Sequence, residues 1–304
     1  MKSTISISLS QYEDVFESIQ RALTHLQPLN ISNNDTIIIK INICDARMPE
    51  TGAITHPLFL DAVIKYLRTN YENLRIFVVE SDATVVIADK FIRWFGYIPV
   101  LQKWDAEFIN LSKQKIINRK TDGGYFKNIP IPELFDKPNF FITLPKLKIN
   151  PLPTITCCLK NQFGCLPVPE KNIYHSRLDD VIADVNKTLC PDLCLVDGII
   201  AMGGTWGPAF GVPIPLNTII CSRDPVAADA FGARLMGFNP WLIGHIRKSA
   251  SCGVGSMRYE IKGDTPEKVD FEINKLETFL LNRVGVFLQK RSRKEFRTVG
   301  GKSW

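Results

Sequence analysis

Residues 141–166 read FITLPKLKINPLPTITCCLKNQFGCL and alternate apolar runs with single lysines. The first run, at 140–144, is short and apolar and is followed by Pro145, which predicts a buried strand that ends at the proline. Lys146 and Lys148 come directly after that strand, and open α/β sheets hold their ligands at the carboxyl ends of their strands. We therefore expect these two lysines at the rim of a sheet.

A second apolar run repeats the arrangement. Residues 154–159 predict another strand, which leads to Lys160, Asn161 and Gly164. Two strands that each deliver a cation to one rim indicate the floor of an anion-binding site. The alternative is that the lysines only end their strands in solvent, and the lysines alone do not decide between the two interpretations.

The segments before this stretch predict a βαβ unit. Its first strand, 35–44 (DTIIIKINIC), is a β-branched run of the kind found in parallel strands covered on both faces. Lys40 and Asn42 interrupt the second half of the run at alternate positions, so they share one face of the strand. A buried lysine is costly unless it has a partner or a ligand, which makes both residues candidates for substrate binding.

The helix of this unit starts after His56, with Pro57 at its first position. His56 is either a capping residue or an acid/base group at a helix N-terminus, where an anion is favoured. The next strand, 74–80, ends in Glu80, and Asp82 follows closely. These two acids can bind a substrate hydroxyl, pair with the lysines or hold a metal.

The second half of the chain offers a second strand end and a glycine-rich segment. Asp197 ends an apolar strand. The stretch 201–211 (AMGGTWGPAFG) contains Gly203, Gly204 and Thr205 and can bring backbone N–H groups close to a ligand. It matches neither GxGxxG followed by a helix nor GxxxxGK[ST], so a dinucleotide or P-loop site has weak support.

Two single residues complete the set of candidates. Asp229 lies among alanines inside a helix expected at 225–236, and a carboxylate on an apolar face needs a partner, which we expect to be one of the lysines. His175 lies near the end of a proline-rich loop at 166–178 and is an acid/base candidate.

The order of these elements predicts one α/β domain over residues 1–282, with a mostly parallel sheet and helices on both faces. The polar segment 112–138 contains a DGG turn and two prolines, which favours an insertion or an edge hairpin. Residues 283–304 form a basic tail with seven basic residues and one acid, which accounts for the net charge of +6. The rest of the chain is therefore near neutral, and we do not expect it to bind nucleic acid.

Hydropathy and cysteine usage indicate a cytoplasmic protein. No apolar run is long enough for a membrane span, and the N-terminus has no signal-peptide pattern. The eight cysteines form no CxxC motif, so we expect them to be reduced and mainly structural. Metal binding by Cys158 with Cys165, or by Cys190 with Cys194, is an alternative with nonspecific spacing.

Several stretches, in their order along residues 36–263, resemble the DUF362 family, a domain of unknown function: IIIKINIC, THPLFLDAVIKYL, FFITLPKLK, TCCLKNQFG, LCLVDGIIAMGGTWGPAFG and CSRDPVAADAFGARLMGF. The positions that match the family's motifs are Lys40, Asn42, Thr55-His56-Pro57, Pro145-Lys146-Lys148, Lys160-Asn161-Gly164, His175, Asp197-Gly198, Gly207-Pro208, Asp224-Pro225 and Asp229.

What the resemblance implies is limited to a soluble domain without a settled reaction, sometimes fused to a ferredoxin-type iron–sulfur module. The chain departs from the family in two ways. Asn150 stands where the family commonly has a histidine, which puts a metal or acid/base role there in doubt. The fused cysteine module is absent, so we do not expect an intrinsic iron–sulfur cluster, and the cofactor stays unknown.

The hypothesis for function is a small-molecule enzyme that acts on a carboxylate or phosphate at the lysine-rich rim, by acid/base chemistry or by redox chemistry with a partner protein. The catalytic candidates are Lys146, Lys160, His175 and His56. The substrate-binding candidates are Lys40, Asn42, Lys148, Asn161, Gly203, Gly204, Thr205, Asp197 and Asp229.

Two alternatives accompany this hypothesis. The first is a non-catalytic protein that binds or helps to assemble an anionic cofactor or an iron–sulfur partner. The second, with weaker support, is a metal site formed by Glu80, Asp82 and His175.

Overall fold

The computed structural model describes residues 2–137, 139–207, 210–274, 276–278 and 280. Pro208 and the basic tail at 283–304 lie outside the described residues. Within the described ranges, every helix is too short or too polar to cross a lipid bilayer.

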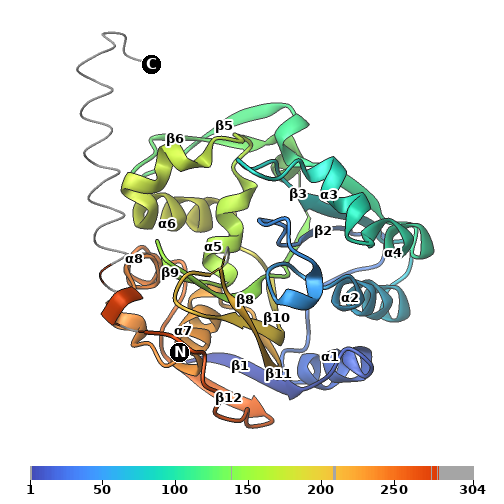
Figure 1. Ribbon diagram of the computed structural model, residues 1–304. Helices are drawn as coiled ribbons and strands as arrows, with labels where there is room; N and C mark the ends of the chain where they lie inside the picture. Colours follow the sequence, from blue (N-terminus) through green and yellow to red (C-terminus); the bar gives the residue numbers. More distant parts are fainter. Residues whose placement is uncertain (1, 138, 208–209, 275, 279, 281–304) are drawn as a thin grey trace.

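A parallel array forms one half of the main sheet (Figure 1). Its strands pair in the order β10, β7, β2, β3 and β4, and every neighbouring pair is parallel. Their bounds are β2 (Thr36–Lys40), β3 (Arg75–Glu80), β4 (Glu107–Asn110), β7 (Phe140–Thr143) and β10 (Leu193–Gly203).

The other half of the sheet brings together the two ends of the described chain. β11 is antiparallel to both β10 and β1, and β1 is parallel to β12 at the edge. The bounds are β1 (Ser3–Leu9), β11 (Val212–Ser222) and β12 (Tyr259–Gly263). The sheet is therefore mixed but mostly parallel, as predicted.

Helices cover both faces of the sheet, because alternate residues of the buried strands supply two separate cores. Along β2, Ile37 and Ile39 belong to one hydrophobic cluster and Ile38 to the other. The first cluster packs under α1 (Val15–Thr24), α2 (Pro57–Asn70), α3 (Ala88–Trp94) and α4 (Tyr97–Lys103). The second packs under α5 (Cys158–Gln162), α6 (Leu178–Thr188), α7 (Pro225–Leu235) and α8 (Gly244–Ser251) (Figure 1).

The segment expected as an insertion forms a small antiparallel sheet apart from the main one. Its strands are β5 (Ile116–Lys120) and β6 (Asn128–Pro132), paired from Ile116 with Pro132 to Lys120 with Asn128. Short 3₁₀ turns connect many of the elements: η1 (Pro49–Thr51), η2 (Leu111–Lys113), η3 (Glu133–Asp136), η4 (Phe163–Cys165), η5 (Lys171–Arg177) and η6 (Pro240–Leu242).

The stretch that carries the lysines folds differently from the prediction. β7 ends at Thr143, just before Pro145, as predicted, but a new strand, β8 (Lys146–Asn150), starts directly after the proline and pairs with the second half of β10. Lys146 and Lys148 are therefore strand residues rather than residues past a strand end.

The second apolar run, 154–159, was expected to be one strand, and that expectation is wrong. It divides into β9 (Thr154–Thr156), which pairs antiparallel with β8, and the start of α5 at Cys158. Lys160 is consequently presented by a short helix. The glycine-rich stretch 201–211 also begins inside β10, which continues to Gly203 before the chain returns as β11.

Candidate functional site

A pocket with a cavity volume of about 260 Å³ lies beyond the carboxyl ends of β2 and β3. We call it the lysine pocket. Six of the residues singled out from the sequence line it: Lys40, Asn42, Glu80, Lys160, Asn161 and His175. Further lining residues include Cys44, Ser81, Asn150, Phe163 and Lys171.

Lys40 is held by a buried carboxylate. Its Nζ lies 2.6 Å from Glu80 Oε1 and donates to the carbonyl of Ile41 at 2.7 Å. The other oxygen of Glu80 accepts the Ile43 N–H at 2.7 Å. Since both charges are buried and well hydrogen-bonded, this pair fixes the end of β2 against the end of β3.

A chain of amides connects the strand ends behind the pocket. Asn42 Nδ2 donates to Asn161 Oδ1 at 3.0 Å, and Asn161 Nδ2 donates to Thr143 Oγ1 at 2.9 Å. Lys148 Nζ donates to Asn42 Oδ1 at 2.7 Å. Three candidates that are far apart in sequence, Asn42, Lys148 and Asn161, therefore form one buried network.

The loop between β2 and α2 covers Lys148, which does not line the lysine pocket. Lys148 Nζ donates to the carbonyl of Ala53 and lies 2.8 Å from Cys44 Sγ. Gly52 lets this loop lie against β10, because it has a φ of 75° and a side chain there would collide with the Ala201 carbonyl. Lys148 thus fixes the side chains of Asn42 and Cys44, which line the lysine pocket, without lining it itself.

Lys160 differs from these lysines in its surroundings. Among the described residues the ammonium group of Lys160 has no ion-pair or hydrogen-bond partner, and its Nζ lies 4.4 Å from the centre of the Phe163 ring. Burial is the main cause that lowers the pKa of Lys160 to about 8, and the charges of Lys148 and Lys40 act in the same direction.

Lys171 lines the same pocket and was missed in the sequence, where it appears only as one polar residue of a proline-rich loop. Its Nζ donates to the backbone carbonyl of Asp82 at 2.7 Å, and burial lowers its pKa to about 8. Nothing in its spacing marks it, because the loop that carries it has no periodic pattern.

His175 stands beside Lys160. Its ring stacks at 6.2 Å on Phe163, the ring that also lies under Lys160. Burial, and secondly the charge of Lys160, lower the pKa of His175 to about 4. The imidazole is therefore neutral at pH 7, so it can accept a proton but is not a cationic acid.

Two predicted catalytic residues, Lys146 and His56, lie in a separate buried cluster and do not line the lysine pocket. Lys146 Nζ lies 2.8 Å from Asp197 Oδ2 and donates to the Tyr12 hydroxyl at 2.8 Å. The backbone N–H of His56 donates to Asp197 at 3.0 Å, and its ring stacks on Tyr12 at 3.9 Å.

This second cluster is charge-balanced. Lys146 and Asp197 are both fully buried, and burial lowers the pKa of Lys146 even though Asp197 opposes the shift. The side chain of His56 accepts the Leu58 N–H at 3.2 Å, which is the capping role considered from the sequence. The arrangement joins β8 to β10 and to the start of α2.

Asp229 and the glycine-rich segment also lie away from the lysines. The expectation that Asp229 pairs with a lysine is wrong, because its Oδ1 accepts the Leu159 N–H at 3.2 Å and its Oδ2 lies 3.6 Å from His245 Nε2. Gly203, Gly204 and Thr205 are not among the residues that line the lysine pocket. Instead, Gly204 N–H donates to the carbonyl of Phe271.

The suggested metal triad is not assembled. Glu80 is bound to Lys40, whereas Asp82 Oδ1 accepts the Ala88 N–H at 2.8 Å and the Asn110 side chain at 3.0 Å. Among the described residues, the group with the spacing of metal ligands is formed by Cys157, Cys158 and Asp229.

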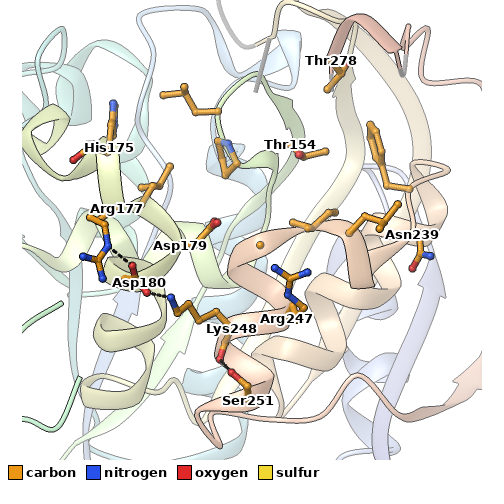
Figure 2. A pocket seen from close by; sticks show the side chains of 18 of the residues that line it. Thr154, His175, Arg177, Asp179, Asp180, Asn239, Arg247, Lys248, Ser251 and Thr278 are labelled. Atoms are coloured by element: carbon orange, nitrogen blue, oxygen red, sulfur yellow. Dashed lines mark hydrogen bonds and ion pairs between the residues drawn. The ribbon is translucent and has the colours of Figure 1, made fainter. Parts of the chain in front are cut away.

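A larger cavity of about 890 Å³ adjoins the lysine pocket (Figure 2). The two share Leu152, Pro153, His175 and Leu178 in their walls. The walls of the larger cavity carry charges of both signs: Arg177, Asp179, Asp180, Arg247 and Lys248. Asp180 pairs with both Arg177, at 2.5 Å, and Lys248.

Comparison with known proteins gives distant similarities. The "Thylakoid-associated protein sll1697" of Synechocystis sp. (strain ATCC 27184 / PCC 6803 / Kazusa) is 26% identical over 252 residues, which cover 79% of this chain and 76% of that protein.

Two solved structures are also similar. A protein from Thermotoga maritima gives a TM-score of 0.40 at 9% identity, over 84% of this chain and 60% of the other. The lactate racemase apoprotein from Thermoanaerobacterium thermosaccharolyticum gives a TM-score of 0.43 at 15% identity, over 77% of this chain and 56% of the other. In both cases the matched region is less than two thirds of the solved chain.

The family assignment rests on a sequence model rather than on these structures. The model described as "Domain of unknown function (DUF362)" matches residues 37–234, which include the lysine pocket's Lys40, Lys160 and His175. The chain belongs to the DUF362 family.

Proposed function

We propose that this protein is an enzyme that binds an anionic small molecule, a carboxylate or a phosphate, in the lysine pocket and moves a proton to or from it. One observation carries the proposal: Lys160 lines the pocket without an ion pair or hydrogen bond among the described residues. A half-buried ammonium group in that position has room for an anionic partner.

The balance of charge around the pocket supports anion binding. Lys40, Lys160 and Lys171 line it, and the one carboxylate among its lining residues, Glu80, is already bound to Lys40. An anion that enters between Lys160 and Lys171 would supply the missing negative charge. Lys171 supplies a second positive charge at the pocket, so it can hold the anion when Lys160 is in its neutral form.

The lowered pKa values support proton transfer. With a pKa of about 8, Lys160 is neutral in about one molecule in ten at pH 7, which is enough for it to act as a base. The proposed step takes a proton from the carbon next to a substrate carboxylate. The C–H electron pair stays on the substrate as an enolate, and the nitrogen of Lys160 becomes an ammonium group.

His175 has a second role in this proposal. Because it is neutral at pH 7, it can accept or share a proton on the side of the larger cavity. Since His175 is part of the wall of both cavities, the substrate would place its anionic group in the lysine pocket and a larger group in the adjoining cavity.

The first test measures binding. Isothermal titration calorimetry of the whole protein with inorganic phosphate, malate and a nucleoside monophosphate should identify a ligand that binds the wild-type chain. Lys160→Met should weaken that binding at least tenfold, because it removes the unpaired charge. This loss corresponds to about 1.4 kcal/mol of binding free energy or more. Lys268→Met, at an exposed position, should bind like the wild type.

Two outcomes would contradict the anion site. The first is that none of the three probes binds. The second is that Lys160→Met and Lys268→Met bind the ligand equally well.

A separate measurement decides between an enzyme and a non-catalytic binding protein. A carboxylate that binds is incubated with the protein in D₂O, and proton NMR follows the hydrogen next to its carboxyl group. Loss of that signal with wild type but not with Lys160→Met supports proton transfer. Binding without any exchange would refute the proposed reaction and leave the binding role.

A further inference from the structure

A second group of reactive side chains is buried on the α5–α8 side of the sheet, apart from the lysine pocket. Cys157 and Cys158 lie at the start of α5, Asp229 lies in α7 and His245 lies in α8. All four side chains are fully buried. None of them lines the lysine pocket or the larger cavity.

The spacing of these groups matches a small cation site. The sulfurs of Cys157 and Cys158 are 3.9 Å apart, and both sulfurs and an oxygen of Asp229 lie within 4.8 Å of one another. Two sulfurs bound at the usual zinc distance to a tetrahedral ion lie about 3.8 Å apart. His245 Nε2 lies 3.6 Å from Asp229 Oδ2, on the same carboxylate.

The hydrogen bonding of the group is incomplete. Within the described part of the chain, Asp229 Oδ2 and both ring nitrogens of His245 are buried and have no hydrogen-bond partner. Each such group destabilises the fold when it stays unsatisfied. Two of these orphaned atoms, Asp229 Oδ2 and His245 Nε2, lie 3.6 Å apart at one buried point beside the sulfurs and therefore indicate a missing ligand there.

We infer that Cys157, Cys158 and Asp229 bind a divalent transition-metal ion, and that His245, beside Asp229 Oδ2, orients the ligating carboxylate. Thiolate donors favour zinc, which also accepts a carboxylate oxygen, so zinc is the expected metal. None of these residues lines either cavity, so metal binding can be measured without reference to the proposed reaction.

The surroundings of the ligands agree with this assignment. Asp229 Oδ1 accepts the Leu159 N–H at 3.2 Å, which fixes the orientation of the carboxylate. A cysteine thiol loses its proton when its sulfur binds a metal ion. Binding of the ion therefore releases two thiol protons, and the ion compensates the charge of the buried carboxylate.

Metal analysis of the wild-type protein tests the inference without any variant. The full chain is produced in zinc-supplemented medium and purified without a chelator or a metal-affinity tag. Elemental analysis should find about one zinc ion per chain. The reduced, metal-free protein titrated with Co²⁺ should develop a thiolate-to-cobalt charge-transfer band and the visible bands of a tetrahedral site.

Variants then locate the site. Cys157→Ser combined with Cys158→Ser should abolish the charge-transfer band, and Asp229→Asn or His245→Gln should weaken cobalt binding at least tenfold. The matched control replaces two exposed cysteines, Cys190→Ser with Cys252→Ser, and should bind like the wild type.

The inference is overturned if the wild-type protein carries no stoichiometric metal and its reduced form shows no cobalt band. It is also overturned if the band persists in the Cys157/Cys158 variant. A failure of that variant to fold does not affect the wild-type measurement.

Discussion

At the scale of single residues, Lys40 and Lys160 show why two lysines of the same pocket have different roles. Lys40 is neutralised by Glu80 at 2.6 Å, so removing either partner would leave an unpaired buried charge. Lys160 has no carboxylate partner among the described residues, and its pKa is lowered to about 8. Lys40 therefore holds strands together, whereas Lys160 is available to a ligand.

His175 gives a prediction about acid stability. Its pKa is about 4 in the folded protein and about 6.5 in an unfolded chain. As the pH falls from 6.5 towards 4, the unfolded chain gains a proton that the folded protein does not bind, so stability is lost in this window. His175→Gln should remove about 1–3 kcal/mol of that loss.

Urea unfolding of wild type and variant at pH 7 and pH 4.5 measures this difference. His25→Gln, at an exposed histidine, is the control and should keep the acid sensitivity of the wild type. The prediction fails if His175→Gln loses as much free energy of unfolding as the wild type over the same pH range.

At the scale of elements, β8 shows what the pattern could and could not indicate. The apolar run before Pro145 correctly predicts β7, but the two lysines that follow belong to β8 and do not line the lysine pocket. Proline removes one N–H donor but does not prevent the next residues from pairing with a new part of a neighbour. The second half of β10 offers that partner, and its length is not visible in residues 141–166.

The boundary between β9 and α5 was missed for a related reason. Short apolar runs do not distinguish a strand from a buried helix, and the run 154–159 contains both. The division at Cys157 follows from tertiary contacts: Asp229 accepts the Leu159 N–H, and Asn186 donates to the Leu159 carbonyl at 2.9 Å. These partners are distant in sequence.

The pairing of β8 with β10 through Lys146 and Asp197 gives a prediction at this scale. Asp197→Ala should lower the free energy of unfolding by about 3–5 kcal/mol, because Lys146 would remain buried without its counter-charge. Lys146→Met combined with Asp197→Leu should recover part of that loss, since it removes both charges together.

Urea unfolding of these variants checks the prediction. Glu133→Ala is the matched control: it breaks an exposed ion pair with Lys115 at 2.6 Å and should change stability little. A loss for Asp197→Ala as small as that of Glu133→Ala would show that the buried pair does not stabilise the fold.

At the scale of the whole molecule, the sequence was sufficient for the class of fold and insufficient for the order of strands. Continuous β-branched runs separated by helices predict a mostly parallel sheet, and the structure confirms it. β1 was not predicted, although Ser3–Leu9 alternates small polar residues with isoleucines, as half-buried strands do; its partner strands lie more than 200 residues away.

The sequence likewise predicted only part of the candidate site, because the positions of some side chains depend on the pairing of strands. Lys40, Asn42, Lys160 and His175 were identified because they follow or interrupt strong patterns, and they do meet at one pocket. Lys146 and His56 follow equally strong patterns but form another cluster, because strand register decides which pairs of side chains meet.

The place of β1 in the sheet leads to a prediction for the whole domain. β1 lies between β11 and β12, and its Ile5 and Ile7 are buried. Deletion of residues 2–9 should abolish the cooperative urea transition, because it exposes this core and separates β12 from the sheet. Thr4→Ala, on the same strand, should unfold cooperatively, and a deletion variant with a wild-type midpoint would contradict the prediction.

The brevity of α5 has a wider consequence. Five residues are too few for a helix that is stable by itself, so neighbouring helices must set its direction. The orientation of Lys160 and Asn161 therefore depends on Asp229 in α7 and Asn186 in α6. Neither of these two residues lines the lysine pocket. Substitutions of Asp229 or Asn186 should thus change the affinity for a ligand. Mutagenesis limited to pocket residues would miss this effect.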